Sequence, residues 1–371
     1  MSTPPTTFEI LDRRLGITTV WQRGVRGSGV TVAVVDTGIT PDSDLAPSIC
    51  CERDFTGEGN PRDRPHERRH GTEIARLVHL VAPEAAIANF KVFPRRDTWV
   101  PFRQRSAVRR SVGQALEHCL AEHPRYRVVN LSLSLTRGWW FWRCAPGHRC
   151  AVCRAVNRAA EAGTVVVTAA GNYGPRPNTI ECPGLAEGAI TVGATLTSAE
   201  TDSWQGAGNQ SGPFGTSFST AYAAGGVALL LSAYADATPD DVRAALAEAA
   251  RPLPGQPPNA QGAGLTHFGR ALEALEARMG PSEAQFNSVQ RQLYFLAGNG
   301  DAQRPDNAFV TQPLTLALDY VEKGLIRRGR LQSAAEELQT IRGYLVPGHL
   351  PEYEQRIRRL MQECQHVPTA R

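Results

Sequence analysis

Four short segments of the chain contain residue types that can carry out acyl transfer. Asp36 ends the apolar run VTVAVVD, His70 lies in RHGTEIA, Asn172 ends GTVVVTAAGN, and Ser217 lies in FGTSFSTAYAAG. Taken singly, each has an ordinary structural explanation, since an acid after a strand often forms a turn and a serine in GTS can cap a helix. Taken together, they supply a nucleophile, a base, an orienting acid and an oxyanion donor.

The chemistry explains why these four residue types belong together. A serine hydroxyl is a poor nucleophile until an imidazole accepts its proton, and a buried carboxylate holds that imidazole in the correct tautomer. A side-chain amide can then donate to the developing oxyanion. The small residues around Ser217 allow close helix packing, and the helix N-terminus adds partial positive charge. We therefore predict Asp36, His70, Ser217 and Asn172 as catalytic residues.

The elements that position these residues are predicted from apolar periodicity. Strand-length apolar runs lie at 30–36, 86–93, 126–135, 163–172 and 188–195, and helical patterns lie at 71–80, 105–122, 149–162, 217–234 and 238–250. Strands that are apolar on both faces are typical of a parallel sheet covered by helices. The expected fold class is α/β, with a doubly wound, mostly parallel sheet whose strand ends carry the site.

The C-terminal part of the chain has a different character. A Pro- and Gly-rich stretch at 251–264 closes the first unit, and a short helical pattern at 267–279 follows it. Four further helical patterns lie at 283–297, 311–325, 329–345 and 351–364. We predict a catalytic domain at 1–280 and a small all-α bundle at 281–371. The bundle either stabilises the catalytic domain or acts as an adaptor or regulatory domain for a partner protein.

Composition excludes several classes of protein. The chain is 42% hydrophobic and 20% charged, as expected for a globular protein with a sizeable core. A net charge of +4 gives no indication of a nucleic-acid partner. No segment approaches the ~20 apolar residues of a membrane span, and MSTPPTTFEILDRRLG lacks the pattern of a secretory signal. We expect a cytoplasmic protein, and the preference for arginine over lysine favours a G+C-rich bacterial genome.

A cysteine cluster indicates a metal site. Cys144, His148, Cys150 and Cys153 follow the spacing C-x3-H-x-C-x2-C, and these are ligand types that tetrahedral zinc prefers. We predict a structural zinc that holds the Trp-rich segment 136–156. Two alternatives remain open at this point: a disulfide of Cys144 with Cys150 or of a cluster cysteine with Cys182, and ordinary buried thiols.

In their residues and in their order along the chain, these motifs resemble those of the subtilisin-like serine proteases, the subtilase family (peptidase S8), over roughly residues 12–250. The matching segments are VTVAVVDTGI, HGTEIA, VAPEAAI, VVNLSLS and GTSFSTAYAAG. The resemblance implies a hydrolase that cuts proteins or peptides and needs no cofactor for catalysis. It also implies Asp36, His70 and Ser217 as the catalytic triad and Asn172 as the oxyanion donor.

The same resemblance implies a substrate site. Leu131, Ser132, Leu133 and Ser134 would pair with the substrate backbone, Ala169, Ala170 and Gly171 would form one side of the first specificity pocket, and Glu181 would lie at its base. A buried carboxylate there favours Arg or Lys at P1, because a basic side chain gives it a partner. The alternative is that Glu181 is a solvated loop acid.

The sequence also departs from the family. Ala221 and Tyr222 replace the usual proline and histidine of the serine motif. The interval between Asn172 and Ser217 is short and lacks the family's Ala-Pro-Gly segment. Because the loops in this interval must be short, we expect none of the family's calcium sites. Few residues precede the first family-like segment, so we expect no N-terminal propeptide of the family's kind. We then expect either narrow specificity or the helical bundle to restrain the activity. We expect peptide maturation or activation of a defence effector as the role. The alternative is a catalytically silent subtilase-fold module that recruits a partner through the helical domain.

Overall fold

The computed structural model describes residues 12–63, 69–94, 102–135, 150–174, 178–195, 215–281, 283–298, 308–326, 330–345 and 350–365. The chain forms two compact units, Met1–Leu272 and Glu273–Arg371. Helix α9 (Phe268–Met279) crosses the division between them. The predicted domain boundary after residue 280 lies just beyond this helix.

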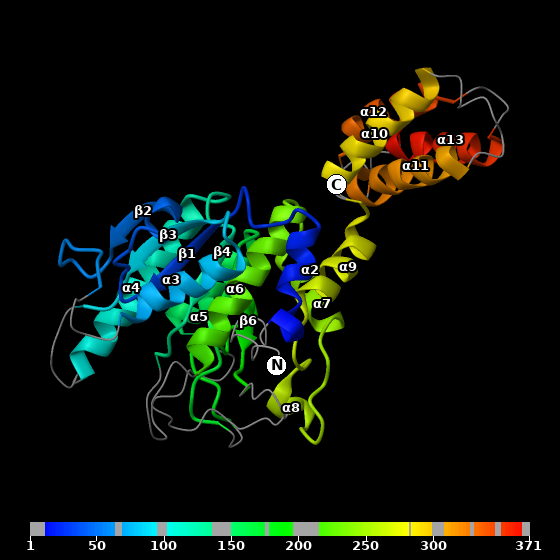
Figure 1. Cartoon of the computed structure of the whole chain (residues 1–371). Coiled ribbons are helices and arrows are strands. Elements are labelled where there is room, and N and C mark those ends of the chain that lie inside the picture. The colour runs from blue at the N-terminus through cyan, green and yellow to red at the C-terminus, as the bar shows by residue number, and fades with distance from the viewer. Residues whose placement is uncertain are drawn as a thin grey trace, which may run out of the picture. The chain divides into compact units, whose positions relative to one another are not determined.

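The first unit is built on a parallel sheet of six strands in the order β2-β3-β1-β4-β5-β6 (Figure 1). Its strands are β1 (Thr31–Asp36), β2 (Ile49–Asp54), β3 (Ala86–Lys91), β4 (Val128–Leu131), β5 (Val165–Ala169) and β6 (Ala189–Val192). All five neighbouring pairs are parallel. The strand order reverses at β1, which places Asp36 at a topological switch point, where α/β sheets bind ligands.

Helices cover the sheet in two sets. Helices α3 (His70–Val81) and α6 (Thr216–Ala233) contact each other and β1, whereas α4 (Phe102–Ala121) and α5 (Ala151–Glu161) form another contacting pair. Ala33 and Val35 belong to the apolar cluster that includes α4 and α5, so the intervening Val32 and Val34 face the opposite side of the sheet. This arrangement confirms the predicted α/β, doubly wound fold class.

Two differences from the predicted elements have simple causes. Strand β2 was not predicted, because ICCERD has no continuous apolar run; it lies at the edge of the sheet, and none of its residues is fully buried. Strand β4 is shorter than the predicted run 126–135 and ends at Leu131. Its continuation at 132–135 lies outside the described strand pairing, so its backbone extends beyond the carboxyl edge of the sheet.

Shorter elements complete the first unit. They are α2 (Ile17–Gln22), η1 (Ala46–Ser48), α7 (Pro239–Glu248) and α8 (Pro258–Gln261). Thr238 caps α7 through a capping box with Asp241. Among the described helices of the whole chain, none combines the length and the apolar character needed to cross a membrane.

The second unit is helical, as predicted. It contains most of α9 and then α10 (Glu283–Gly298), α11 (Ala308–Asp319), the π-helix η3 (Tyr320–Leu325), α12 (Leu331–Gly343) and α13 (Pro351–Gln365). Its core is an apolar cluster whose fully buried members include Leu314, Leu318, Leu338 and Leu360. This unit therefore has a hydrophobic core of its own.

Candidate active site

Asp36 and His70 form a hydrogen-bonded pair at the carboxyl edge of the sheet. The apolar strand β1 ends at Asp36, whose side chain is 1% exposed, and α3 begins at His70. His70 Nδ1 lies 2.8 Å from Asp36 Oδ1. The carboxylate also accepts a hydrogen bond from the Thr37 amide at 2.7 Å. Because Asp36 binds Nδ1, Nε2 of the same ring remains available for proton transfer.

A second buried carboxylate, Asp63, lies behind this pair. Its Oδ1 accepts a hydrogen bond from Thr37 Oγ1 at 2.5 Å, and its Oδ2 accepts from the amide and hydroxyl of Thr72 at 2.9 and 2.7 Å. Thr37 Oγ1 in turn accepts from the Gly71 amide at 2.9 Å. Asp63 thus joins the end of β1 to the start of α3, the two elements that carry Asp36 and His70.

Sequence reasoning did not find Asp63. The signal that could have found it is indirect: Thr37 and Thr72 directly follow the motif residues Asp36 and His70-Gly71, and both hydroxyls need a partner when buried. Thr72 is fully buried and Asp63 is 5% exposed. The partner of these two threonines is therefore a carboxylate from the loop that precedes α3.

Electrostatics adjust the basicity of His70. The negative charge of Asp36 raises the pKa of His70 above its usual value, and the hydrogen bond to Asp36 and the charge of Asp63 act in the same direction against the opposing effect of burial. Burial also raises the pKa of Asp63, with a contribution from neighbouring Asp36. His70 is consequently a stronger base than an isolated imidazole.

Ser217 lies in the first turn of α6, next to the predicted substrate strand. Its hydroxyl donates to the carbonyl oxygen of Ser132 at 3.1 Å, and the Ser132 hydroxyl donates to the carbonyl oxygen of Ser217 at 2.8 Å. Asn130 Nδ2 donates to the Ser132 hydroxyl at 3.0 Å. The ring of Phe218 stands edge-on to His70 with centroids 6.2 Å apart. The structure therefore brings the start of α6 beside His70.

Asn172 lies against the same helix start. Its Oδ1 accepts hydrogen bonds from the amide and the hydroxyl of Thr216, both at 3.0 Å. This pairing leaves the Asn172 NH₂ group as a donor. Gly215 has φ +137, and a Cβ there would lie 3.3 Å from Asn172 Oδ1, so glycine suits both the backbone conformation and the close approach. Asn172 Nδ2 and the Ser217 amide can thus act as oxyanion donors.

The predicted pocket residues come together through one loop. The Glu181 amide donates to the Ala170 carbonyl oxygen at 2.9 Å, and the Leu135 amide donates to the Cys182 carbonyl oxygen at 2.9 Å. Residues 181–182 therefore connect the two segments predicted to bind substrate. Leu131, which ends β4, and the following Ser132 and Leu133 are buried, whereas Ser134 is exposed.

Glu181 is 7% exposed, so it is not the solvated loop acid of the alternative interpretation. Its carboxylate packs on Gly171, where an added Cβ would lie 2.6 Å from Oε2. Gly171 also has φ +99, a conformation that favours glycine. Ala169 and Ala170 precede it at the end of β5, so the predicted pocket side and the predicted pocket base are in contact.

Two of the four predicted metal ligands, Cys150 and Cys153, lie in the described part of the chain. Cys150 and Cys153 lie at the start of α5 with their sulfurs beside Cys182, and all three ligand atoms are within 4.8 Å of one another. Cys144 and His148 lie outside the described residues. The predicted set omitted Cys182 as a zinc ligand, because its distance along the chain gave no spacing signal.

This parallel sheet with an Asp-His pair and a serine at a helix start is the architecture of subtilisin-like serine proteases. The model of the subtilase family (Peptidase S8) matches residues 27–214 and 212–264. These stretches include all four predicted catalytic residues. The chain belongs to the subtilase family, whose catalytic reaction needs no cofactor.

Two curated relatives are similar to much of the chain. The serine protease AprX of Bacillus subtilis (strain 168) is 29% identical over 302 residues, which cover 65% of this chain and 65% of that protein. A thermostable alkaline protease of Halalkalibacterium halodurans is 30% identical over 274 residues, covering 68% of this chain and 70% of that protein. The match to AprX thus spans slightly less than two thirds of its length.

A solved structure shows the same fold. MycP1 from Mycobacterium smegmatis aligns with a TM-score of 0.54 and 22% sequence identity, covering 73% of this chain and 87% of that chain. At this identity the likeness concerns the fold alone. It supports the arrangement of sheet and helices described above.

Proposed function

We propose that this chain is a serine endopeptidase that hydrolyses peptide bonds in a protein or peptide substrate. The observation that carries the proposal is the 2.8 Å contact between His70 Nδ1 and Asp36 Oδ1 next to the helix start that bears Ser217. Family membership supports the same activity. The alternative is a catalytically silent module that binds a partner through the subtilase fold, and the experiment below separates the two.

In the proposed mechanism each of these residues has one role. Ser217 Oγ attacks the scissile carbonyl carbon while His70 Nε2 accepts its proton, and Asp36 stabilises the resulting imidazolium. Asn172 Nδ2 and the Ser217 amide donate to the oxyanion. His70 then gives the proton to the leaving amine, the C–N bond breaks, and an acyl-enzyme remains. Water, deprotonated by His70, hydrolyses that ester and restores Ser217. The Ser217 hydroxyl must first rotate away from the Ser132 carbonyl.

The test is labelling with a fluorescent fluorophosphonate, which reacts only with an activated serine. Wild type should label, Ser217→Ala should not, and Ser232→Ala on the same helix should label like wild type. If circular dichroism shows a folded wild-type protein that does not label, with or without the helical unit, the result would favour the binding module.

We propose further that the enzyme prefers Arg or Lys at P1. The carboxylate of Glu181 is nearly buried and packs on Gly171, one side of the predicted specificity pocket. This position supports the preference, because a basic substrate side chain would offset the cost of burying a charge. A panel of peptides that differ only at P1 tests it. Glu181→Gln should lower kcat/KM for Arg and Lys by roughly 10- to 100-fold and spare Leu. The exposed Glu187→Gln is the matched control, and equal effects of both variants would refute the preference.

The helical unit is proposed as an adaptor or regulatory domain of a bacterial cytoplasmic protease. Tyr294 is 71% exposed and stands edge-on to Tyr344 with centroids 6.5 Å apart, which supports a contact surface, since tyrosine is enriched at binding hot spots. The proposed role is maturation of a peptide or activation of a defence effector inside the cell. Such a role requires recruitment of one partner rather than general digestion.

Truncation after Gly280, which keeps α9 intact, tests the role of the helical unit. An inhibitory unit predicts stronger fluorophosphonate labelling after truncation. An adaptor predicts unchanged labelling of Ser217 but slower cleavage of the partner protein. Loss of labelling together with loss of thermal stability would instead show a purely stabilising unit.

A further inference from the structure

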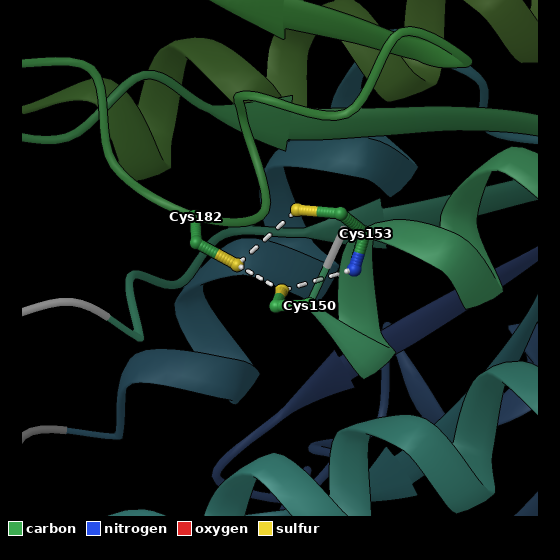
Figure 2. A group of neighbouring side chains, drawn as sticks. All are labelled: Cys150, Cys153 and Cys182. Atoms are coloured by element: carbon green, nitrogen blue, oxygen red, sulfur yellow. Dashed lines mark hydrogen bonds between the residues drawn. The ribbon is translucent and has the colours of Figure 1, made fainter. Parts of the chain in front are cut away.

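Three cysteine side chains converge near the predicted specificity pocket. The sulfur of Cys182 lies 3.4 Å from the sulfur of Cys150 and 3.5 Å from that of Cys153. Cys153 and Cys182 are buried, Cys150 is partly buried, and all three are thiols. Figure 2 shows the sulfurs turned toward one another from the start of α5 and from the loop that carries Cys182.

The spacing of the sulfurs fits a metal. A tetrahedral zinc with Zn–S bonds of about 2.3 Å places its sulfur ligands about 3.8 Å apart. The two measured separations are slightly shorter, and all three sulfurs lie within 4.8 Å of one another. These separations are therefore compatible with one central ion bonded to all three sulfurs.

One helix start positions two of the three sulfurs. Cys150 is the N-cap of α5, and the Cys153 amide donates to the Cys150 sulfur at 3.4 Å. This eleven-residue helix therefore holds two of the three sulfurs at its N-terminus. An amide that donates to a ligand sulfur also orients it and reduces its charge. Both sulfurs of the C-x2-C pair thus lie at one helix start, beside the sulfur of Cys182.

We propose that Cys150, Cys153 and Cys182 bind one zinc ion as three thiolates. Each thiol releases its proton to solvent as its sulfur–metal bond forms, and a further donor completes the tetrahedron. This set keeps Cys150 and Cys153 from the sequence-based prediction and adds Cys182, which is 29 positions from Cys153 in the sequence. The site is structural, because its ligands lie outside the predicted catalytic group.

The metal would fix the wall of the specificity pocket. Cys182 directly follows Glu181, and its carbonyl oxygen accepts a hydrogen bond from the Leu135 amide at 2.9 Å. A zinc ion would therefore tie the start of α5 to the loop that holds Glu181 against Gly171. This consequence rests on the proposed protease function, whereas the metal site itself does not.

The first test uses the full chain with the Ser217→Ala change, which separates metal binding from activity and prevents self-cleavage. Zinc content by mass spectrometry should be about one equivalent per chain. After zinc removal, titration with Co²⁺ alone should give thiolate-to-cobalt charge-transfer bands and the visible bands of tetrahedral cobalt. Absence of both zinc and a cobalt spectrum would overturn the site and leave the proposed protease function untouched.

Single variants then identify the ligands. Cys153→Ser and Cys182→Ser should each lower the cobalt charge-transfer intensity by about a third or abolish binding. The matched controls are Cys119→Ser, in the same apolar cluster, and Cys364→Ser, in the helical unit. Unchanged spectra in both test variants would overturn the assignment. So would a disulfide between Cys182 and Cys150 or Cys153 in protein purified without oxidant. If a variant misfolds, the wild-type cobalt intensity still reports the number of thiolates.

Discussion

Ser217 and Ser132 exchange hydrogen bonds. The Ser217 hydroxyl donates to the Ser132 carbonyl oxygen at 3.1 Å, and the Ser132 hydroxyl donates to the Ser217 carbonyl oxygen at 2.8 Å. The two residues are 85 positions apart in the sequence. This exchange joins the helix that bears the proposed nucleophile to the segment proposed to bind the substrate backbone, so a shift in one displaces the other.

Replacing Ser132 with alanine should slow catalysis while the fold remains. The change removes the side-chain donor to the Ser217 carbonyl, and we expect the activation barrier to rise by about 1–2 kcal/mol, a roughly 5- to 30-fold loss of kcat/KM. The control is Ser232→Ala, which removes a similar hydroxyl-to-carbonyl bond, to Ser28, near the far end of α6. A Ser132→Ala enzyme with wild-type kinetics would show that the exchange does not position Ser217.

Replacing Asp63 with asparagine should change the pH dependence of activity. Only neutral His70 can accept the Ser217 proton, and a raised His70 pKa keeps the ring protonated to higher pH. The charge of Asp63 contributes to that rise. Removing it lowers the His70 pKa, so the acid limb of kcat/KM against pH should move to lower pH.

The matched control for this change is Asp42→Asn. Asp42 is also linked to α3, through Arg76, but it is exposed. Its replacement should leave the acid limb where it is. An acid limb that moves to higher pH in the Asp63 variant, or not at all, would contradict the electrostatic role of Asp63.

Replacing Gly171 with alanine should disturb both stability and specificity. The residue would need φ +99, and its Cβ would meet Glu181 Oε2 at 2.6 Å. We expect a loss of about 1–3 kcal/mol in the free energy of unfolding and a reduced preference for basic P1 residues. Gly24→Ala separates the two causes, since Gly24 has φ +76 but no atom within 4 Å of an added Cβ. The control should lose stability alone, as thermal melts and the peptide panel would show.

Replacing Arg356 with alanine should weaken the helical unit. One guanidinium nitrogen of Arg356 lies 2.5 Å from Asp319 and 2.7 Å from Glu322, and its side chain is 25% exposed. Loss of this linkage between α13 and the end of α11 should cost about 1–3 kcal/mol. Arg358→Ala, which removes a 70% exposed side chain paired with Glu354, should cost less than about 0.5 kcal/mol. Hydrogen exchange of the backbone amides in α11 and α13 measures the loss of stability in each variant. Equal protection of these amides in the two variants would contradict the expected difference in stability.

Much of the fold followed from local sequence patterns. Apolar runs on both faces predicted five of the six strands, because a buried parallel strand needs apolar side chains on both sides. The same runs placed Asp36 and Asn172 at strand ends, while His70 and Ser217 were placed at helix starts. Strand β2 escaped prediction because it is an edge strand with no fully buried residue, and ICCERD has no continuous apolar run.

The sequence by itself determined which residues could react and on which elements they lie, because motif, capping and periodicity are properties of neighbouring residues. The tertiary structure alone decided which distant side chains meet. It brought Asp63 to Thr37 and Thr72, packed Glu181 on Gly171 and placed Cys182 beside Cys150 and Cys153. Each of these contacts depends on the path of a loop, and a loop's path is set by the packing of the elements it connects rather than by its own local pattern.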